Sequence, residues 1–111
     1  MSIEQTNVID FAGVDLKTGK VRLAISDHLP WDEKGLHLKL LQDKLNAYLE
    51  FIEGGQLQEK HPESIGHQPV IHIFGKYPLS EKAKFFLDKA TKAIRDLGFD
   101  LVFTQIKSDQ D

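Results

Sequence analysis

The segment from Val70 to Ile106 constrains the fold more than any other part of the chain. Its first residues, Val70 to Gly75, are almost entirely apolar, which predicts a strand covered on both sides. A helix is predicted from about Glu81 to Leu97, and a last strand from Phe99 to Ile106. Such a unit is long enough for a right-handed crossover between parallel strands. The pattern therefore predicts a sheet that contains a parallel pair.

The preceding residues add a hairpin and a long helix. Strands are predicted from Val8 to Val14 and from Val21 to Ser26, joined by a turn in which Gly19 supplies a positive φ. A helix from about Glu33 to Glu53 follows and ends at a pair of glycines. The order is ββαβαβ. We expect an α+β fold with one four-stranded mixed sheet and two helices packed on one face.

Length and composition limit the class of protein. The 111 residues suit a single α+β domain over residues 1–111, with a frayed tail at residues 107–111. A net charge of -3 disfavours nucleic acid as a partner. No apolar run approaches the ~20 residues that span a bilayer, and no signal peptide is recognisable, so we expect a cytoplasmic protein without a membrane partner. The absence of cysteine excludes disulfides and thiolate zinc sites.

The stretch "ISDHLPWDEKGLH", residues 25–37, is rich in side chains that carry chemistry. Asp32 is a candidate N-cap, because its carboxylate can accept hydrogen bonds from free N–H groups of the first helical turn. Trp31 and Leu36 have the spacing of a hydrophobic staple. We therefore predict that Trp31 and Asp32 have a structural capping role. The alternative is a metal or acid–base site formed by His28, Asp32 and His37. Their spacing matches no established set of metal ligands, and no serine nucleophile motif or orienting partner accompanies them.

Two polar residues of the same stretch are not explained by capping. Asp27 and His28 follow the predicted second strand, and His72 lies within the third. These three residues are the candidates for a catalytic site. His61, His67 and His72 could in principle hold a metal, but His67 and His72 would be roughly 16 Å apart along an extended chain. We predict no metal site and no cofactor.

Five short pieces of the chain carry a resemblance. They are "IEQTNVIDF", "ISDHLPWD", "LNAYLEFIEGG", "KYP" and "GFDL", of which D-H-L-x-W-D is the most specific. In these pieces, which extend over nearly the whole chain, the protein resembles a family of short, uncharacterised bacterial proteins known as a domain of unknown function. The resemblance implies a small bacterial protein of the cytoplasm. It supplies neither an activity nor site residues.

Apolar residues occupy two sides of the first long helix. Leu36, Leu40 and Phe51 lie on the far side of a stripe that a sheet would already cover, and Phe85 lies outside the buried face of the second helix. The neighbouring helix or the long loop could cover them, or a second subunit could. We predict a homodimer with interface candidates Leu36, Leu40, Phe51 and Phe85. The sheet face turned away from the helices could also bind a protein partner or a small ligand.

The sequence therefore favours a non-enzymatic cytoplasmic interaction module that self-associates. The alternative is a small hydrolase or ligand-binding enzyme that uses Asp27 and His28, with His72 as a third candidate. A deep pocket around these residues would favour the enzyme, whereas a flat apolar surface would favour the module.

Overall fold

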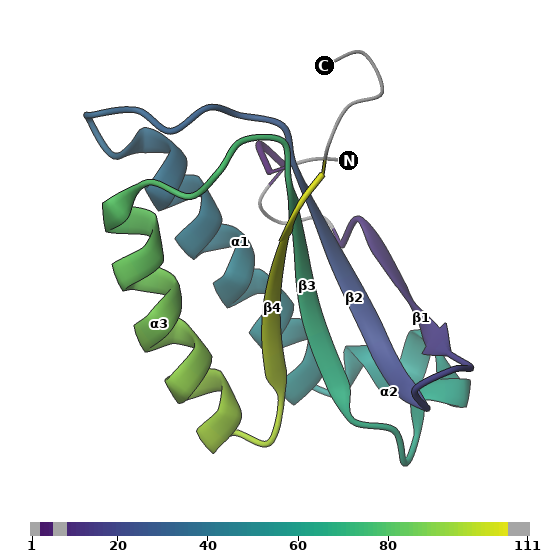
Figure 1. Ribbon diagram of the computed structural model, residues 1–111. Coiled ribbons are helices and arrows are strands. Elements are labelled where there is room, and N and C mark those ends of the chain that lie inside the picture. The colour runs from purple at the N-terminus through teal and green to yellow at the C-terminus, as the bar shows by residue number, and fades with distance from the viewer. Residues whose placement is uncertain (1–2, 6–8, 107–111) are drawn as a thin grey trace.

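The computed structural model describes residues 3–5 and 9–106 of the chain (Figure 1). The sheet begins with a hairpin in which β1 (Phe11–Asp15) pairs antiparallel with β2 (Lys20–Asp27). In the turn between them Gly19 has a φ of 72°, a conformation that glycine adopts without strain. The predicted hairpin is present. Val8, where the first strand was predicted to begin, and the predicted frayed tail at residues 107–111 lie outside the described residues.

The four strands form one mixed sheet in the order β1-β2-β3-β4, where β3 spans Pro69–Gly75 and β4 spans Asp100–Gln105. β2, β3 and β4 are parallel, and the connections between them contain the long helices α1 (Leu36–Glu53) and α3 (Glu81–Asp96). Both crossovers step in the same direction across the sheet, so right-handed connections place both helices on one face, as Figure 1 shows. The predicted ββαβαβ fold is confirmed.

The hydrophobic core lies between this face of the sheet and the long helices. α1 packs on the sheet through Leu41, Leu45 and Tyr48, and α3 contributes Leu87 and Ile94. The fully buried residues of the two central strands are Val21, Leu23, Ile25, Ile71 and Ile73. Burial of a large apolar side chain stabilises the fold by about 1.5–3 kcal/mol. The central strands and α1 therefore supply much of the stability.

α1 begins later than the sequence predicted. It starts at Leu36 rather than Glu33, because residues 32–35 form a turn in which Gly35 has a φ of 79°. The predicted hydrophobic staple between Trp31 and Leu36 is also wrong, because the side chain of Leu36 is 65% exposed. Trp31 instead stacks on His37.

The buried side of α1 differs from the predicted stripe as well. It includes two polar residues, His37 and Lys44, and it includes Phe51. Phe51 is 7% exposed and belongs to the core of the chain itself, which corrects its assignment to an outward stripe. Leu40 is half-buried against the same core. The apolar residues of α1 are therefore mostly covered within the single chain.

The segment between α1 and β3 is not the patternless loop that the sequence suggested. It contains a short helix, α2 (Gln56–Lys60), and a single 3-10 turn, η1 (Pro62–Ser64). α2 is fixed by Leu57, which is 3% exposed and lies in the core. In the described part of the chain no helix is long and apolar enough to cross a bilayer.

The second face of the sheet, here called the open face, is turned away from α1 and α3 (Figure 1). The register aligns Arg22 with Val70 and Asp100, and Ala24 with His72 and Val102. Residues aligned in this way share a face. The open-face side chains are Phe11, Asp15, Lys20, Arg22, Ala24, Ser26, Val70, His72, Phe74, Asp100, Val102 and Thr104. It is therefore a mixed surface of apolar, charged and hydroxyl groups, as the strand alternation predicted.

Candidate functional site

A buried carboxylate–imidazole pair lies where β2 ends and α1 begins. Asp27 Oδ2 is 2.6 Å from His37 Nε2, and the two side chains are 2% and 3% exposed. The other carboxylate oxygen of Asp27 accepts a hydrogen bond from the N–H of Leu29 at 3.2 Å. His37 Nδ1 lies 3.0 Å from the carbonyl oxygen of Pro30. Each polar atom of the pair therefore has a partner within the chain.

The Pro30 carbonyl determines where the protons of this pair lie. A carbonyl oxygen can only accept a hydrogen bond, so His37 Nδ1 carries a hydrogen and donates it to Pro30. The Nε2 atom then shares one proton with the Asp27 carboxylate. The pair resembles the base and orienting acid of a hydrolase in chemistry. Its burial, however, leaves no atom of it free to meet a substrate.

Trp31 and Asp32 also contact His37. The indole of Trp31 stacks on the His37 ring, with ring centroids 3.7 Å apart and 12° between the planes. The carboxylate of Asp32 accepts hydrogen bonds from the N–H groups of His37 at 3.0 Å and Leu36 at 3.1 Å. These hydrogen bonds, first that of His37, hold the pKa of Asp32 below its usual range. Asp32 therefore accepts hydrogen bonds from the first two N–H groups of α1, although the residue at the N-cap position is Gly35 and not Asp32.

The three predicted catalytic candidates are not brought together. Asp27 is committed to His37, while His28 lies on the surface, 52% exposed, with its Nε2 atom 3.2 Å from the carboxylate of Glu4. His72 is on the open face, where its Nε2 atom is 2.7 Å from Thr104 Oγ1. The partner of Asp27 is thus His37, which was not among the three candidates.

A second buried polar cluster, which sequence reasoning missed, joins α1 to the N-terminal segment. Lys44 is completely buried, and its Nζ atom donates to Asp10 Oδ1 and to the carbonyl oxygen of Gln5, each at 2.8 Å. The hydroxyl of Tyr48 accepts from the N–H of Asp10 and donates to the carbonyl oxygen of Ala24. Burial raises the pKa of Tyr48. The signal in the sequence is a lysine placed among apolar residues at helical spacing.

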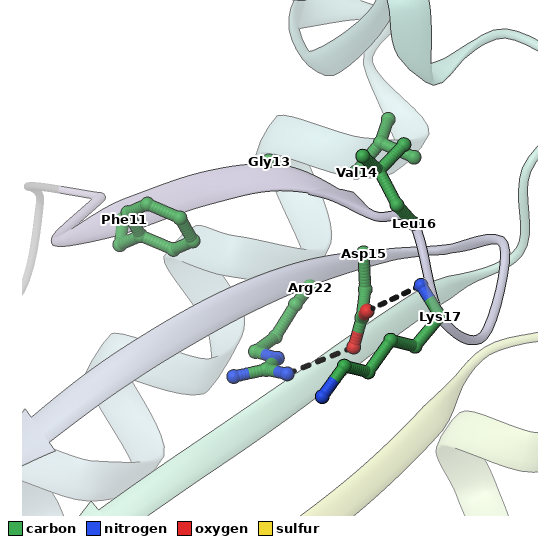
Figure 2. A pocket seen from close by; sticks show the side chains of 7 residues that line it. All are labelled: Phe11, Gly13, Val14, Asp15, Leu16, Lys17 and Arg22. Carbon is green, nitrogen blue, oxygen red and sulfur yellow. Dashed lines mark hydrogen bonds and ion pairs between the residues drawn. The ribbon is translucent and has the colours of Figure 1, made fainter.

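A hollow of about 440 Å³ lies on the open face beside the β1–β2 hairpin. Figure 2 shows the carboxylate of Asp15 between the guanidinium of Arg22, at 2.8 Å, and the backbone N–H of Lys17, at 2.9 Å. These two hydrogen bonds, the one from Lys17 first, lower the pKa of Asp15. Phe11, which is 56% exposed, lines the same hollow. The carboxylate of Asp15 and the guanidinium of Arg22 already pair with each other here.

A second cavity, of about 490 Å³, lies between the N-terminal ends of α1 and α3; we call it the Trp31 cavity. Trp31 and Leu38 form its apolar part. Its charged lining residues are Asp32, Glu33, Glu81 and Lys82. It is close to the carboxyl ends of β2 and β3, the edge at which open sheets with parallel strands bind ligands.

The histidines outside this region do not form a metal site. His61 Nδ1 is 3.2 Å from the carboxylate of Glu63, the ring of His67 contacts the Gly19 carbonyl, and His72 pairs with Thr104. Within the described residues, no three His, Asp or Glu side chains are grouped so that they could hold a metal ion.

Comparison with known proteins supplies a family and no activity. No curated protein and no solved structure matches the chain. A family model described as a family of unknown function (DUF6572) matches residues 1–107, which include both buried polar clusters and the whole sheet. The chain therefore belongs to this family of unknown function, DUF6572.

Proposed function

We propose that the protein is a non-enzymatic interaction module that forms a homodimer by pairing β4 with β4 of a second copy. The observation that carries this proposal is the edge of the sheet at β4, which pairs with β3 on one side and with no described strand on the other. An exposed strand edge is a template for pairing with another chain.

The free edge of β4 has a defined set of hydrogen-bonding groups. Ile106 donates its N–H inward to the carbonyl oxygen of Gly75. Because the direction of the backbone groups alternates along a strand, the N–H and C=O groups of Leu101, Phe103 and Gln105 face outward. Three outward residues can form a short antiparallel ladder with an identical strand.

The two edges of the sheet differ in their protection. β4 contains no proline, lysine or glycine, the residues with which proteins weaken an edge strand. β1, at the opposite edge, is shorter, contains Gly13, and has α2 beside it in Figure 1. β4 is therefore the edge more suited to pairing.

The surface next to β4 is suited to a second copy of the same chain. A groove of about 200 Å³ runs between α3 and β4, with Leu87 and Phe103 on its apolar walls and Lys84 and Asp88 at its rim. A two-fold axis reverses the direction of α3 in the partner, which brings Lys84 toward the partner's Asp88 and Asp88 toward the partner's Lys84. Lys84 and Asp88 lie one turn apart on the same helix, so a two-fold axis can pair each of them with the opposite charge of the partner. The groove of one copy is therefore complementary to the groove of the other.

The register of the proposed pair follows from the outward groups. With the two-fold axis at Phe103, this residue forms a hydrogen-bonded pair with the partner's Phe103. Leu101 then pairs with the partner's Gln105, and Val102 lies opposite the partner's Thr104. Of the predicted interface residues, Phe85 is on α3 beside Lys84 and is 63% exposed, whereas Leu36 and Leu40 are on α1, outside this groove.

Sedimentation of a proline variant tests the proposal. Gln105→Pro removes an outward N–H, which an edge strand tolerates, and should convert the dimer to a folded monomer at micromolar concentration. Gln105→Ala keeps the N–H and should remain dimeric. A wild-type protein that sediments as a monomer would contradict the proposal, and so would a Gln105→Pro protein that remains a dimer.

Cross-linking tests the register separately. The chain has no cysteine, so single substitutions introduce the only thiol. A mixture of Val102→Cys and Thr104→Cys proteins should form a disulfide-linked heterodimer, because side chains directly opposite in a sheet are about 4.5–5.5 Å apart at Cβ. Leu16→Cys, which is on the fully exposed hairpin turn, is the control and should not cross-link to Thr104→Cys.

Among the described residues, Asp27 is buried in its pair with His37 and His28 is on the surface beside Glu4, which supports the interaction module over the hydrolase alternative. We propose a location in the bacterial cytoplasm, with which a chain that lacks cysteine is compatible. The net charge of -3 supports a protein partner over nucleic acid.

A further inference from the structure

We propose that the Trp31 cavity binds an organic cation, and that a guanidinium group fits it best. The cavity is separate from the β4 edge, so this inference does not depend on the proposed dimer. Its volume of about 490 Å³ is within the range of small-molecule sites, roughly 300–1,000 Å³.

The indole of Trp31 is held rigidly at this site. One face of it stacks on His37, whose ring nitrogens are fixed by Asp27 and Pro30. Trp31 also lines the cavity, together with Leu38. A flat cation can stack on a tryptophan with attraction from the ring electrons, and a ring that is already fixed loses little entropy on binding.

The charge of the rim favours a cation. Three carboxylates, those of Asp32, Glu33 and Glu81, and one ammonium group, that of Lys82, line the cavity. Glu81 also pairs with Lys84 at 3.6 Å, which leaves these five side chains with a net negative charge. The helix N-termini, which would favour an anion, already donate some of their N–H groups to side chains of the chain itself. Asp32 accepts from the first N–H groups of α1, and the hydroxyl of Ser80 accepts from the N–H of Ala83 in α3 at 3.1 Å.

A guanidinium group matches this combination better than an ammonium group does. It is planar, so it can lie on the indole, and its N–H groups can reach a carboxylate in a two-point contact. The group could come from a free small molecule or from an arginine side chain of a polypeptide. The same chemistry would bind both.

Trp31 is the only tryptophan of the chain, so its fluorescence reports directly on the site. Agmatine, a free guanidinium compound, and the peptide Gly-Arg-Gly should each change the emission in a saturable way. The peptide Gly-citrulline-Gly, which has the same shape without the charge, should not. Tighter binding of agmatine than of Gly-Arg-Gly would indicate a small-molecule ligand, and the reverse would indicate an arginine side chain.

Two exposed carboxylates allow a matched test by mutation. The double variant Glu33→Gln/Glu81→Gln should bind the guanidinium probes about five- to tenfold more weakly, since each exposed charge contact contributes little. Glu53→Gln, at the opposite end of α1, makes the same chemical change away from the cavity and should bind like wild type. Circular dichroism confirms that each variant is folded.

Three results would overturn the inference. The first is the absence of a saturable change in Trp31 emission with either guanidinium probe at millimolar concentration. The second is an equal response to Gly-citrulline-Gly. The third is an unchanged affinity of the folded double variant for the guanidinium probes.

Discussion

Asp27 and His37 illustrate how single polar residues can fix the entry to a helix. The pair connects the last residue of β2 to the first turn of α1, and Trp31 stacks on the imidazole. Burial makes such a pair costly to disrupt, because a polar group that loses its partner inside the protein cannot regain water. The residues that resemble catalytic groups are thus used to hold two elements together.

Asp27→Ala should lower the free energy of unfolding by roughly 3–5 kcal/mol, because it leaves His37 Nε2 buried without a partner. Urea unfolding followed by circular dichroism measures this. The double variant Asp27→Leu/His37→Phe removes both polar groups and should regain much of the loss. A loss below about 1 kcal/mol for Asp27→Ala would be the value of an ordinary hydrogen bond and would contradict this role.

His72, on the open face, responds to the charge of Arg22. Burial first, and then the positive charge of Arg22, lowers the pKa of His72 from its usual 6.5. Arg22→Gln should therefore raise the His72 pKa toward 6.5, as followed by the NMR signals of the ring. Lys17→Gln, which removes a cation from the same hairpin, should leave the pKa unchanged.

The same shift makes stability depend on pH. As the pH falls below about 6.5, the unfolded chain binds a proton at His72 before the folded chain does, so His72 contributes a loss of stability in acid. His72→Gln should remove this contribution. A urea midpoint with the same pH dependence in wild type and His72→Gln would contradict the assignment.

Among the elements, α3 was easier to predict than α1. On α3, the side chain of Ser80 caps the helix, and Ala83, Leu87 and Ile94 form its buried face. Polar residues at the start of a helix and an apolar stripe are local signals that agree with each other. The sequence therefore indicated this helix correctly, whereas the order of the strands within the sheet was not predicted.

Ser80→Ala should lower the free energy of unfolding by about 1 kcal/mol, because the N–H of Ala83 loses its acceptor. Ser80→Asp keeps an acceptor at the same position and should retain most of the stability. Thermal or urea unfolding of the two variants beside wild type makes the comparison, and equal losses in both would contradict a capping role.

α1 was harder to predict because its buried side contains charge and polarity. His37 and Lys44 occupy buried positions, so an analysis of apolar residues alone rotates the predicted stripe and leaves Phe51 outside it. The partners of these two residues, Asp27 and Asp10, lie 10 and 34 positions away in the sequence. Contacts at such distances depend on the folded topology, which local patterns do not specify. The buried pair was missed for this reason.

At the scale of the whole molecule, the sheet combines one local pairing with two distant ones. Asp15 pairs with Lys20 across a short turn, whereas Val21 pairs with Pro69, 48 positions along the chain. Val70 pairs with Asp100, 30 positions away. Alternation and turn residues predicted the hairpin directly. The length of the segment from Val70 to Ile106 predicted one parallel pair, β3 with β4, whereas the parallel β2–β3 pair and the cavities between elements were not predicted.

This topology determines the order in which the strands can pair during folding. A hairpin forms in roughly 1–10 μs, but the β2–β3 pair must wait until the long intervening segment has closed. Until α3 and β4 dock, β3 is itself an open edge, and a neighbouring chain can occupy the place of β4. The yield of native protein therefore depends on the rate of closure within one chain relative to the rate of association between two chains. Dilution during refolding slows association and so favours closure within the chain.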